Sequence, residues 1–165
     1  MDENEREPRV VVFCCNWCAY ASTDVSGKAR LRYPSGVRIV RVMCSGRVDP
    51  YFVLRAFELG FDGVMIAGCH LGDCHYLSGN ERAEQRVQML KQLLGVIGIE
   101  PERLKLAFFS ASEGGKFAKV VTDFVEEVKR IGRNKVRVTK PEAELEDLDS
   151  IIADTEVYYL SLIHI

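Results

Sequence analysis

Four short apolar runs, separated by stretches with helical periodicity, constrain the fold of this 165-residue chain more than any other feature. The runs are rich in Val and Ile and cover residues 9–14, 37–43, 62–68 and 104–109. Short, continuously apolar segments of this kind are typical of strands that are buried on both faces. Since strands that alternate with helices pair in parallel through right-handed crossovers, the pattern predicts an α/β fold. We expect a single open parallel sheet of four to five strands with helices on both faces.

Turn and capping residues indicate where the helices begin and end. Asp49 followed by Pro50 is a helix start signal, and Gly60 is a stop signal. The Ser–Glu spacing of a capping box precedes two further helical stretches, at Ser78 and Glu81 and at Ser110 and Glu113. Helices that connect buried parallel strands in this way are typical of a doubly wound, flavodoxin-like sheet.

The cysteines are concentrated where the predicted strands end. All six lie in the first 74 residues, at Cys14, Cys15, Cys18, Cys44, Cys69 and Cys74. Because the carboxyl ends of parallel strands meet at the edge where α/β sheets bind ligands, we expect these thiols to gather in one site. A buried cysteine is often only a small apolar residue. That explanation suits Cys14, which we expect to pack at the end of its strand, but it does not suit five thiols together.

Three kinds of chemistry fit these thiols. An iron–sulfur cluster needs four ligands, usually thiolates, and Gly46, Gly68 and Gly72 allow backbone N–H groups to approach the sulfurs. Structural zinc also needs four ligands, but it typically replaces a hydrophobic core in small modules. A thioredoxin-like dithiol would use only two thiols, Cys15 and Cys18. We therefore favour the cluster and leave the zinc and dithiol hypotheses open.

Other residues near the thiols have simpler interpretations. We expect His70 and His75 to be polar neighbours of the site, because five thiols are enough without imidazole ligands. Trp17 and Tyr20 are expected to pack on the first helix, and Trp17 also to shield the site from water. The sequence shows no Ser/His/Asp grouping of the kind that hydrolytic enzymes use. We therefore expect the site to carry electrons and to transform no substrate of its own.

Charge and hydropathy exclude several classes of protein. The net charge is −2, from 22 basic and 24 acidic residues, which gives no electrostatic reason to expect nucleic acid or a membrane as partner. No apolar run reaches the roughly 18 residues that a membrane-spanning helix needs. The first residues, MDENEREPR, are acidic where a signal peptide would be basic and then apolar. We expect a cytoplasmic protein.

The chain divides into an expected iron–sulfur, flavodoxin-like domain at residues 1–132 and a C-terminal extension at residues 133–165. Residues 135–139, KVRVT, are a candidate fifth strand, and an acidic amphipathic segment follows them. The last six residues, LSLIHI (160–165), equal an in-frame translation of the end of a common sequencing transposon. We expect those six residues to be an artefact of sequencing.

Three motifs, CNWCAY, MCSGRVDP and GCHLGDCHYLSGN, resemble the delta subunit of the methyl-viologen-reducing hydrogenase of methanogens, also called the hydrogenase iron–sulfur subunit. The resemblance extends over about residues 8–132. It implies one 2Fe–2S cluster that relays single electrons from a hydrogenase or a formate dehydrogenase. The implied acceptor is the flavin-containing A subunit of heterodisulfide reductase, in an electron-bifurcating complex.

The family cysteines fall on Cys15, Cys18, Cys44, Cys69 and Cys74. We expect the ligands to be Cys15, Cys18 and Cys44 together with either Cys69 or Cys74, and the choice among the five stays open at this point. The alternatives are a structural zinc-binding adaptor and a thioredoxin-like dithiol redox protein.

Overall fold

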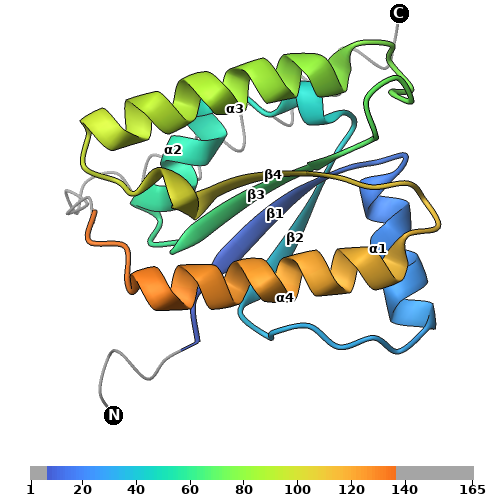
Figure 1. Ribbon diagram of the computed structural model, residues 1–165, viewed down its shortest axis with the longest axis horizontal. Helices are drawn as coiled ribbons and strands as arrows, with labels where there is room; N and C mark the ends of the chain where they lie inside the picture. Colours follow the sequence, from blue (N-terminus) through green and yellow to red (C-terminus); the bar gives the residue numbers. More distant parts are fainter. Residues whose placement is uncertain (1–6, 137–165) are drawn as a thin grey trace, which may run out of the picture.

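The computed structural model describes residues 7–136 and confirms the α/β prediction (Figure 1). Its four parallel strands lie in the order β2-β1-β3-β4. Their bounds are β1 Val10–Cys15, β2 Val37–Val42, β3 Gly63–Gly68 and β4 Leu104–Phe108. Each strand lies within one residue of the run that predicted it, and β1 continues far enough to include both of its cysteines.

Four α-helices cover the two faces of this sheet, α1 Ala19–Lys28, α2 Pro50–Glu58, α3 Gly79–Val96 and α4 Gly114–Ile131. Helices α1 and α4 pack on one face, and α2 and α3 on the other (Figure 1). Alternate residues of β1 face opposite sides, as the period of a strand requires: Val12 packs with Phe124 of α4, and Phe13 lies in the cluster with Leu90 of α3. Two short 3₁₀ helices, η2 Ser45–Arg47 and η3 Pro101–Arg103, complete the regular structure of residues 7–136.

The capping signals were partly correct. Asp49 begins α2 as expected, since its carboxylate accepts a hydrogen bond of 2.9 Å from the N–H of Tyr51. Gly60 follows the end of α2 with a φ of 79°, a left-handed conformation that favours glycine. Ser78 is the N-cap of α3, as its spacing from Glu81 predicts, although its side chain makes no capping bond. The Glu113 carboxylate accepts a bond from the Ser110 N–H, as a capping box requires, but α4 begins at Gly114, a turn later than Ser110 would place it.

A buried polar cluster closes the amino edge of the sheet. Arg103, only 1% exposed, donates hydrogen bonds to the carbonyl oxygens of Asp62, Gly132 and Arg133. The carboxylate of Asp62 accepts from the backbone N–H of Asn134, and the Asn134 amide donates to the carbonyls of Phe57 in α2 and Phe61 in the loop after it. These bonds hold residues 132–134, which follow α4, against the amino ends of β3 and β4.

The expected fifth strand is only partly testable. Lys135 and Val136 form no strand, and residues 137–139 lie outside the described part, as do the acidic segment and residues 160–165. Among residues 7–136, no helix combines the length and the apolar character that crossing a membrane requires.

Candidate thiol site at the carboxyl edge

Five of the cysteines lie at the carboxyl edge of the sheet, as the parallel topology predicts. Cys15 is the last residue of β1, and Cys18 follows as the N-cap of α1. Cys44 lies just beyond β2 and is the N-cap of η2. Cys69 follows β3 directly, and Cys74 lies in the loop between β3 and α3. All five residues therefore lie at the carboxyl ends of three neighbouring strands or in the loops that follow them.

The sulfur atoms form two close pairs. The Sγ atoms of Cys15 and Cys69 are 3.6 Å apart, and those of Cys44 and Cys74 are 4.0 Å apart. Cys18 lies beside Cys69, where their thiols interact as hydrogen-bond partners. None of these cysteines is in a disulfide. The structure thus brings all five predicted site residues together and adds a pairing that the sequence did not predict.

Glycines allow the cysteine loops to approach one another. Gly79, the first residue of α3, lies against the Cys44–Cys74 pair so closely that a Cβ atom there would overlap the Cys44 sulfur and lie 3.2 Å from that of Cys74. A Cβ on Gly46 would lie 2.6 Å from the carbonyl oxygen of Gly79. A Cβ on Gly68 would lie 2.8 Å from the Ser45 hydroxyl. The N–H of Gly46 approaches the Cys44 sulfur and Gly72 turns its loop with a φ of 87°, both as expected. Gly68 lies nearest to Ser45 and not to a sulfur, and Gly79 was missed.

Burial and backbone N–H groups affect the thiols differently. Burial raises the pKa of Cys69, and its neighbours Cys18 and Cys15 raise that pKa further. Burial also opposes ionisation of Cys74, but the N–H groups of Tyr76, Asn80 and Gly79 outweigh it, so the pKa of Cys74 is lowered. The N-terminal turn of α3 therefore stabilises negative charge on Cys74, whereas burial raises the pKa of Cys44.

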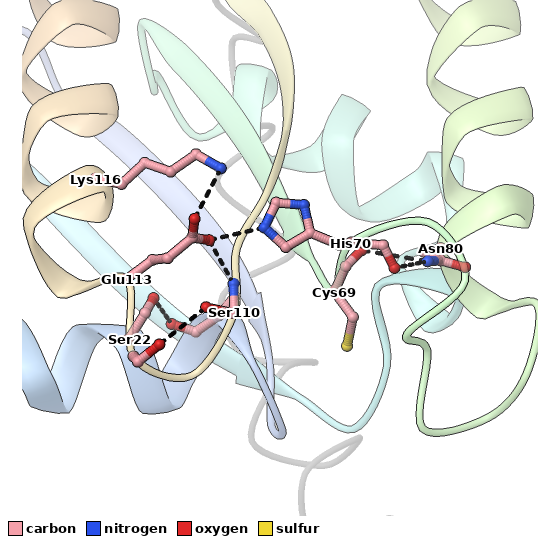
Figure 2. A network of polar contacts seen from close by, with 9 residues as sticks. Ser22, Cys69, His70, Asn80, Ser110, Glu113 and Lys116 are labelled. Atoms are coloured by element: carbon pink, nitrogen blue, oxygen red, sulfur yellow. Dashed lines mark hydrogen bonds and ion pairs between the residues drawn. The ribbon is translucent and has the colours of Figure 1, made fainter.

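Asn80 connects the two ends of the β3–α3 loop, which contains Cys69 and Cys74. Its buried amide donates hydrogen bonds of 3.3 Å and 2.6 Å to the carbonyl oxygens of Cys69 and His70 (Figure 2). Its side-chain oxygen accepts a bond from the N–H of Glu81 within α3. Asn80 thus ties the end of β3 to the helix that contacts the second sulfur pair.

A second connection runs from this loop to α4. The imidazole Nε2 of His70 lies 2.8 Å from a carboxylate oxygen of Glu113, and the N–H of Ser110 donates to the same oxygen (Figure 2). The Ser110 N–H, then His70 and the charge of Lys116, lower the pKa of Glu113 to about 2. His70 is therefore engaged with a carboxylate and is a polar neighbour of the site, as expected.

Aromatic side chains cover the cysteine loop. The indole of Trp17 stacks on the imidazole of His75, with 3.8 Å between ring centroids, and Tyr76 meets both rings edge to face. Trp17 remains 41% exposed, so the expectation that it packs on the first helix was wrong. The cause is the stacking partner, which lies 58 positions further along the chain and which no local pattern indicates. Cys14, by contrast, is fully buried in the core, as expected.

Fold and site together define a small α/β domain with a thiol cluster at the carboxyl edge of a parallel sheet. Residues 10–132 match the family described as methyl-viologen-reducing hydrogenase, delta subunit. The vhc iron–sulfur D subunit of an F420-non-reducing hydrogenase from Methanococcus voltae is 51% identical over 126 residues, which cover 76% of this chain and 88% of the relative. The corresponding iron–sulfur D subunit from Archaeoglobus profundus is 50% identical over 128 residues, or 78% of this chain and 93% of that relative.

A longer relative carries the same domain. The A subunit of the ferredoxin:CoB–CoM heterodisulfide reductase from Methanosarcina mazei is 46% identical over 125 residues, which are 76% of this chain but only 16% of that protein. The chain therefore belongs to the methyl-viologen-reducing hydrogenase delta subunit family. The resemblance of its three cysteine-containing motifs to that family is confirmed.

Proposed function

We propose that this chain binds one 2Fe–2S cluster through two pairs of thiolates, Cys15 with Cys69 and Cys44 with Cys74. In this proposal it relays single electrons between a hydrogenase and the A subunit of a heterodisulfide reductase. The observation that carries the proposal is the convergence of two sulfur pairs, at 3.6 Å and 4.0 Å, on one edge of the sheet. When bound, such a cluster accepts and returns one electron at a time.

The pair distances match the geometry of thiolate ligation. Two thiolates bound to one tetrahedral metal at about 2.3 Å have their sulfurs about 3.8 Å apart. A 2Fe–2S cluster with four cysteine ligands needs two such pairs, one for each iron. The pairing favours Cys69 and Cys74 together, and leaves Cys18 as a fifth thiol beside the cluster. This choice replaces the sequence-based set, in which Cys18 was a ligand.

The chain's own groups suit an anionic cluster. Ala19, the first residue of α1, donates its N–H to the Cys15 sulfur at 3.3 Å, and the first turn of α3 directs N–H groups at Cys74. Such bonds to sulfur tune the reduction potential of a bound cluster. Cys15, Cys69 and Cys74 are at most 9% exposed, which limits the access of water to their sulfurs.

Two kinds of relative support the proposed partners. Relatives of nearly the same length carry names as the iron–sulfur D subunit of an F420-non-reducing hydrogenase, which supports a hydrogenase as one partner. In relatives from Methanosarcina the same domain is part of the A subunit of heterodisulfide reductase, which supports that protein as the other partner. By the family resemblance we extend the proposal to formate dehydrogenase as a further electron donor and to electron bifurcation in the assembled complex.

The two alternatives receive less support. A single zinc ion needs its ligands around one point, and among residues 7–136 no group of three or more His, Cys, Asp or Glu side chains is arranged to hold one ion. A dithiol mechanism would pair Cys15 with Cys18, whereas the Cys15 sulfur has Cys69 as its close neighbour.

Anaerobic purification with iron, acid-labile sulfide and zinc quantified per chain tests the proposal. We expect two irons and two sulfides, visible absorption, and a paramagnetic resonance signal after one-electron reduction. Replacing Cys15, Cys44, Cys69 or Cys74 by serine should remove most of the iron, and Cys18→Ser should retain it. Zinc in place of iron, or loss of iron only from Cys18→Ser, would contradict the proposal.

A further inference from the structure

We propose that the free edge of β2, with the loops on either side of it, is a docking surface for a protein partner that presents an acidic face. We call this surface the basic edge and define it by its six cationic residues: Lys28, Arg30, Arg32, Arg38, Arg41 and Arg47. The inference goes beyond the proposed electron relay, because it identifies where and by what chemistry a partner binds.

The charge of the basic edge is one-sided. Between Asp24 and Asp49 the chain has six of its 22 basic residues and none of its 24 acidic residues. All six cationic side chains are exposed, and none forms an ion pair within residues 7–136. The net charge of −2 therefore conceals a strongly positive region on an otherwise acidic molecule. Such a separation of charge steers an acidic partner towards the positive side.

The basic edge adjoins the thiol site. Within the described residues 7–136, β2 is an edge strand that pairs on one side only, with β1, and Cys44 follows the strand after a single intervening residue. That intervening residue, Met43, is 57% exposed, and Val40 within the strand is 40% exposed. A partner seated here would cover exposed apolar side chains and would lie next to the Cys44–Cys74 pair.

The opposite edge of the sheet shows that this charge is not general to edge strands. On β4, the ammonium group of Lys105 is paired with Glu127 at 3.0 Å, and the groove beside that strand is lined by charges of both signs. Cationic residues on an edge strand often serve only to prevent aggregation. That role accounts for Arg38 and Arg41 in β2, but not for the four cationic residues in the adjoining helix and loops.

The composition of the basic edge favours a protein over a nucleic acid. Five of its six cationic residues are arginine, and arginine and methionine are enriched in protein interfaces where lysine is depleted. Arg41 is held over the ring of Tyr20, with 5.1 Å from the guanidinium carbon to the ring centroid, and Arg38 donates to the Ser35 carbonyl. Cationic groups held in this way lose less side-chain entropy when an acidic partner binds. In the part of the chain that the structure describes, one carboxylate is bonded in this region, that of Glu7, and it accepts from Ser35 and Gly36 and from none of the six cationic side chains.

A matched pair of charge-reversal variants of the full chain tests the inference. The first, Lys28→Glu/Arg32→Glu/Arg38→Glu, alters the basic edge. The second, Lys119→Glu/Lys129→Glu/Arg130→Glu, makes the same change of net charge on exposed positions of α4. The probes are the purified A subunit of heterodisulfide reductase and the hydrogenase, each titrated at several NaCl concentrations. We expect the association rate with one of them to fall about tenfold or more in the first variant only, and to fall with salt in the unmodified chain.

The outcomes separate this inference from the relay itself. Equal binding by the two variants, or binding that does not depend on salt, would overturn the basic edge while leaving the relay intact. Failure of the unmodified chain to bind either probe would overturn both proposals. Salt-dependent binding of a short DNA duplex that only the first variant loses would identify the edge as a nucleic-acid site and overturn the inference. Circular dichroism of both variants checks that the fold is retained.

Discussion

The two ends of the same parallel sheet differ in the kind of groups that they bring together. At the amino edge, Arg103, Asp62 and Asn134 are buried and bonded to one another or to main-chain carbonyls. At the carboxyl edge, five thiols lie close together, and the loop above them holds Leu77 with a φ of 69° and its side chain 86% exposed. The difference indicates that the amino edge stabilises the fold, whereas the carboxyl edge combines a strained loop residue with clustered thiols suited to binding.

Both edges use a buried asparagine in the same way, which makes the comparison testable. The Asn80 amide donates to the carbonyls of Cys69 and His70, and the Asn134 amide donates to those of Phe57 and Phe61. If the comparison holds, substitutions at the carboxyl edge should reduce the metal content more than the stability. Substitutions at the amino edge should reduce the stability more than the metal content.

The largest effect on the carboxyl edge is expected from Gly79→Ala. The added Cβ would overlap the Cys44 sulfur, so one sulfur pair must move. We expect nearly all of the bound iron to be lost while the sheet stays folded, as measured by iron per chain and far-ultraviolet circular dichroism. The matched control in the same helix is Gly95→Ala, whose Cβ would meet nothing closer than 3.7 Å. It should retain iron and gain up to about 1 kcal/mol of stability. Full iron content in Gly79→Ala would contradict the assigned ligand pair.

The largest effect on the amino edge is expected from Arg103→Ala. It removes the donor for three carbonyl oxygens, and a buried acceptor left without a donor costs about 1–3 kcal/mol. Since water can reach some of these groups, we expect a loss of about 3 kcal/mol in the free energy of unfolding, measured by urea denaturation of the metal-free protein. Iron content at room temperature should be unchanged in the molecules that remain folded. If Arg103→Ala had normal stability but reduced iron content, the amino edge would contribute to metal binding and not to the stability of the fold.

The sequence predicted the sheet and the grouping of the thiols, because both depend on local patterns and on parallel topology. It could not predict how the sulfurs pair, since Cys15 meets Cys69 across 54 residues of sequence and the approach of Cys44 to Cys74 depends on the missing Cβ of Gly79. Glu113 is instructive for the same reason. Its spacing from Ser110 indicated a helix cap, and the carboxylate does bond the Ser110 N–H, but it also bonds His70, a partner 43 residues away. Contacts of that range leave no periodic signal in a single sequence.

A smaller and more discriminating effect is expected from the two asparagines. Asn80→Ala and Asn134→Ala each remove an amide bonded to two carbonyls, so each should cost about 1–3 kcal/mol of unfolding free energy. Only Asn80→Ala should also change the visible circular dichroism and the midpoint reduction potential of the proposed cluster, because only Asn80 positions Cys69. Identical spectra and potentials in the two variants would show that Asn80 has a structural role alone.

The smallest effect is expected at Glu113, which joins the cysteine loop to α4 near the surface. Its pKa in the folded chain is lowered to about 2 by the N–H of Ser110, then by His70, from about 4.3 in an unfolded chain. A lowered pKa means that the carboxylate stabilises the folded state above about pH 4.3, and that this contribution disappears as the pH falls towards 2. Glu113→Gln should therefore lower the urea midpoint of the metal-free protein at pH 7 and converge with the unmodified chain near pH 2. Glu126→Gln, at an exposed position of the same helix, is the control. If Glu113→Gln still differed from the unmodified chain by the same amount at pH 2, the carboxylate would act through packing and not through its charge. The contrast between this surface contact and the buried amino edge would then be weaker than the geometry indicates.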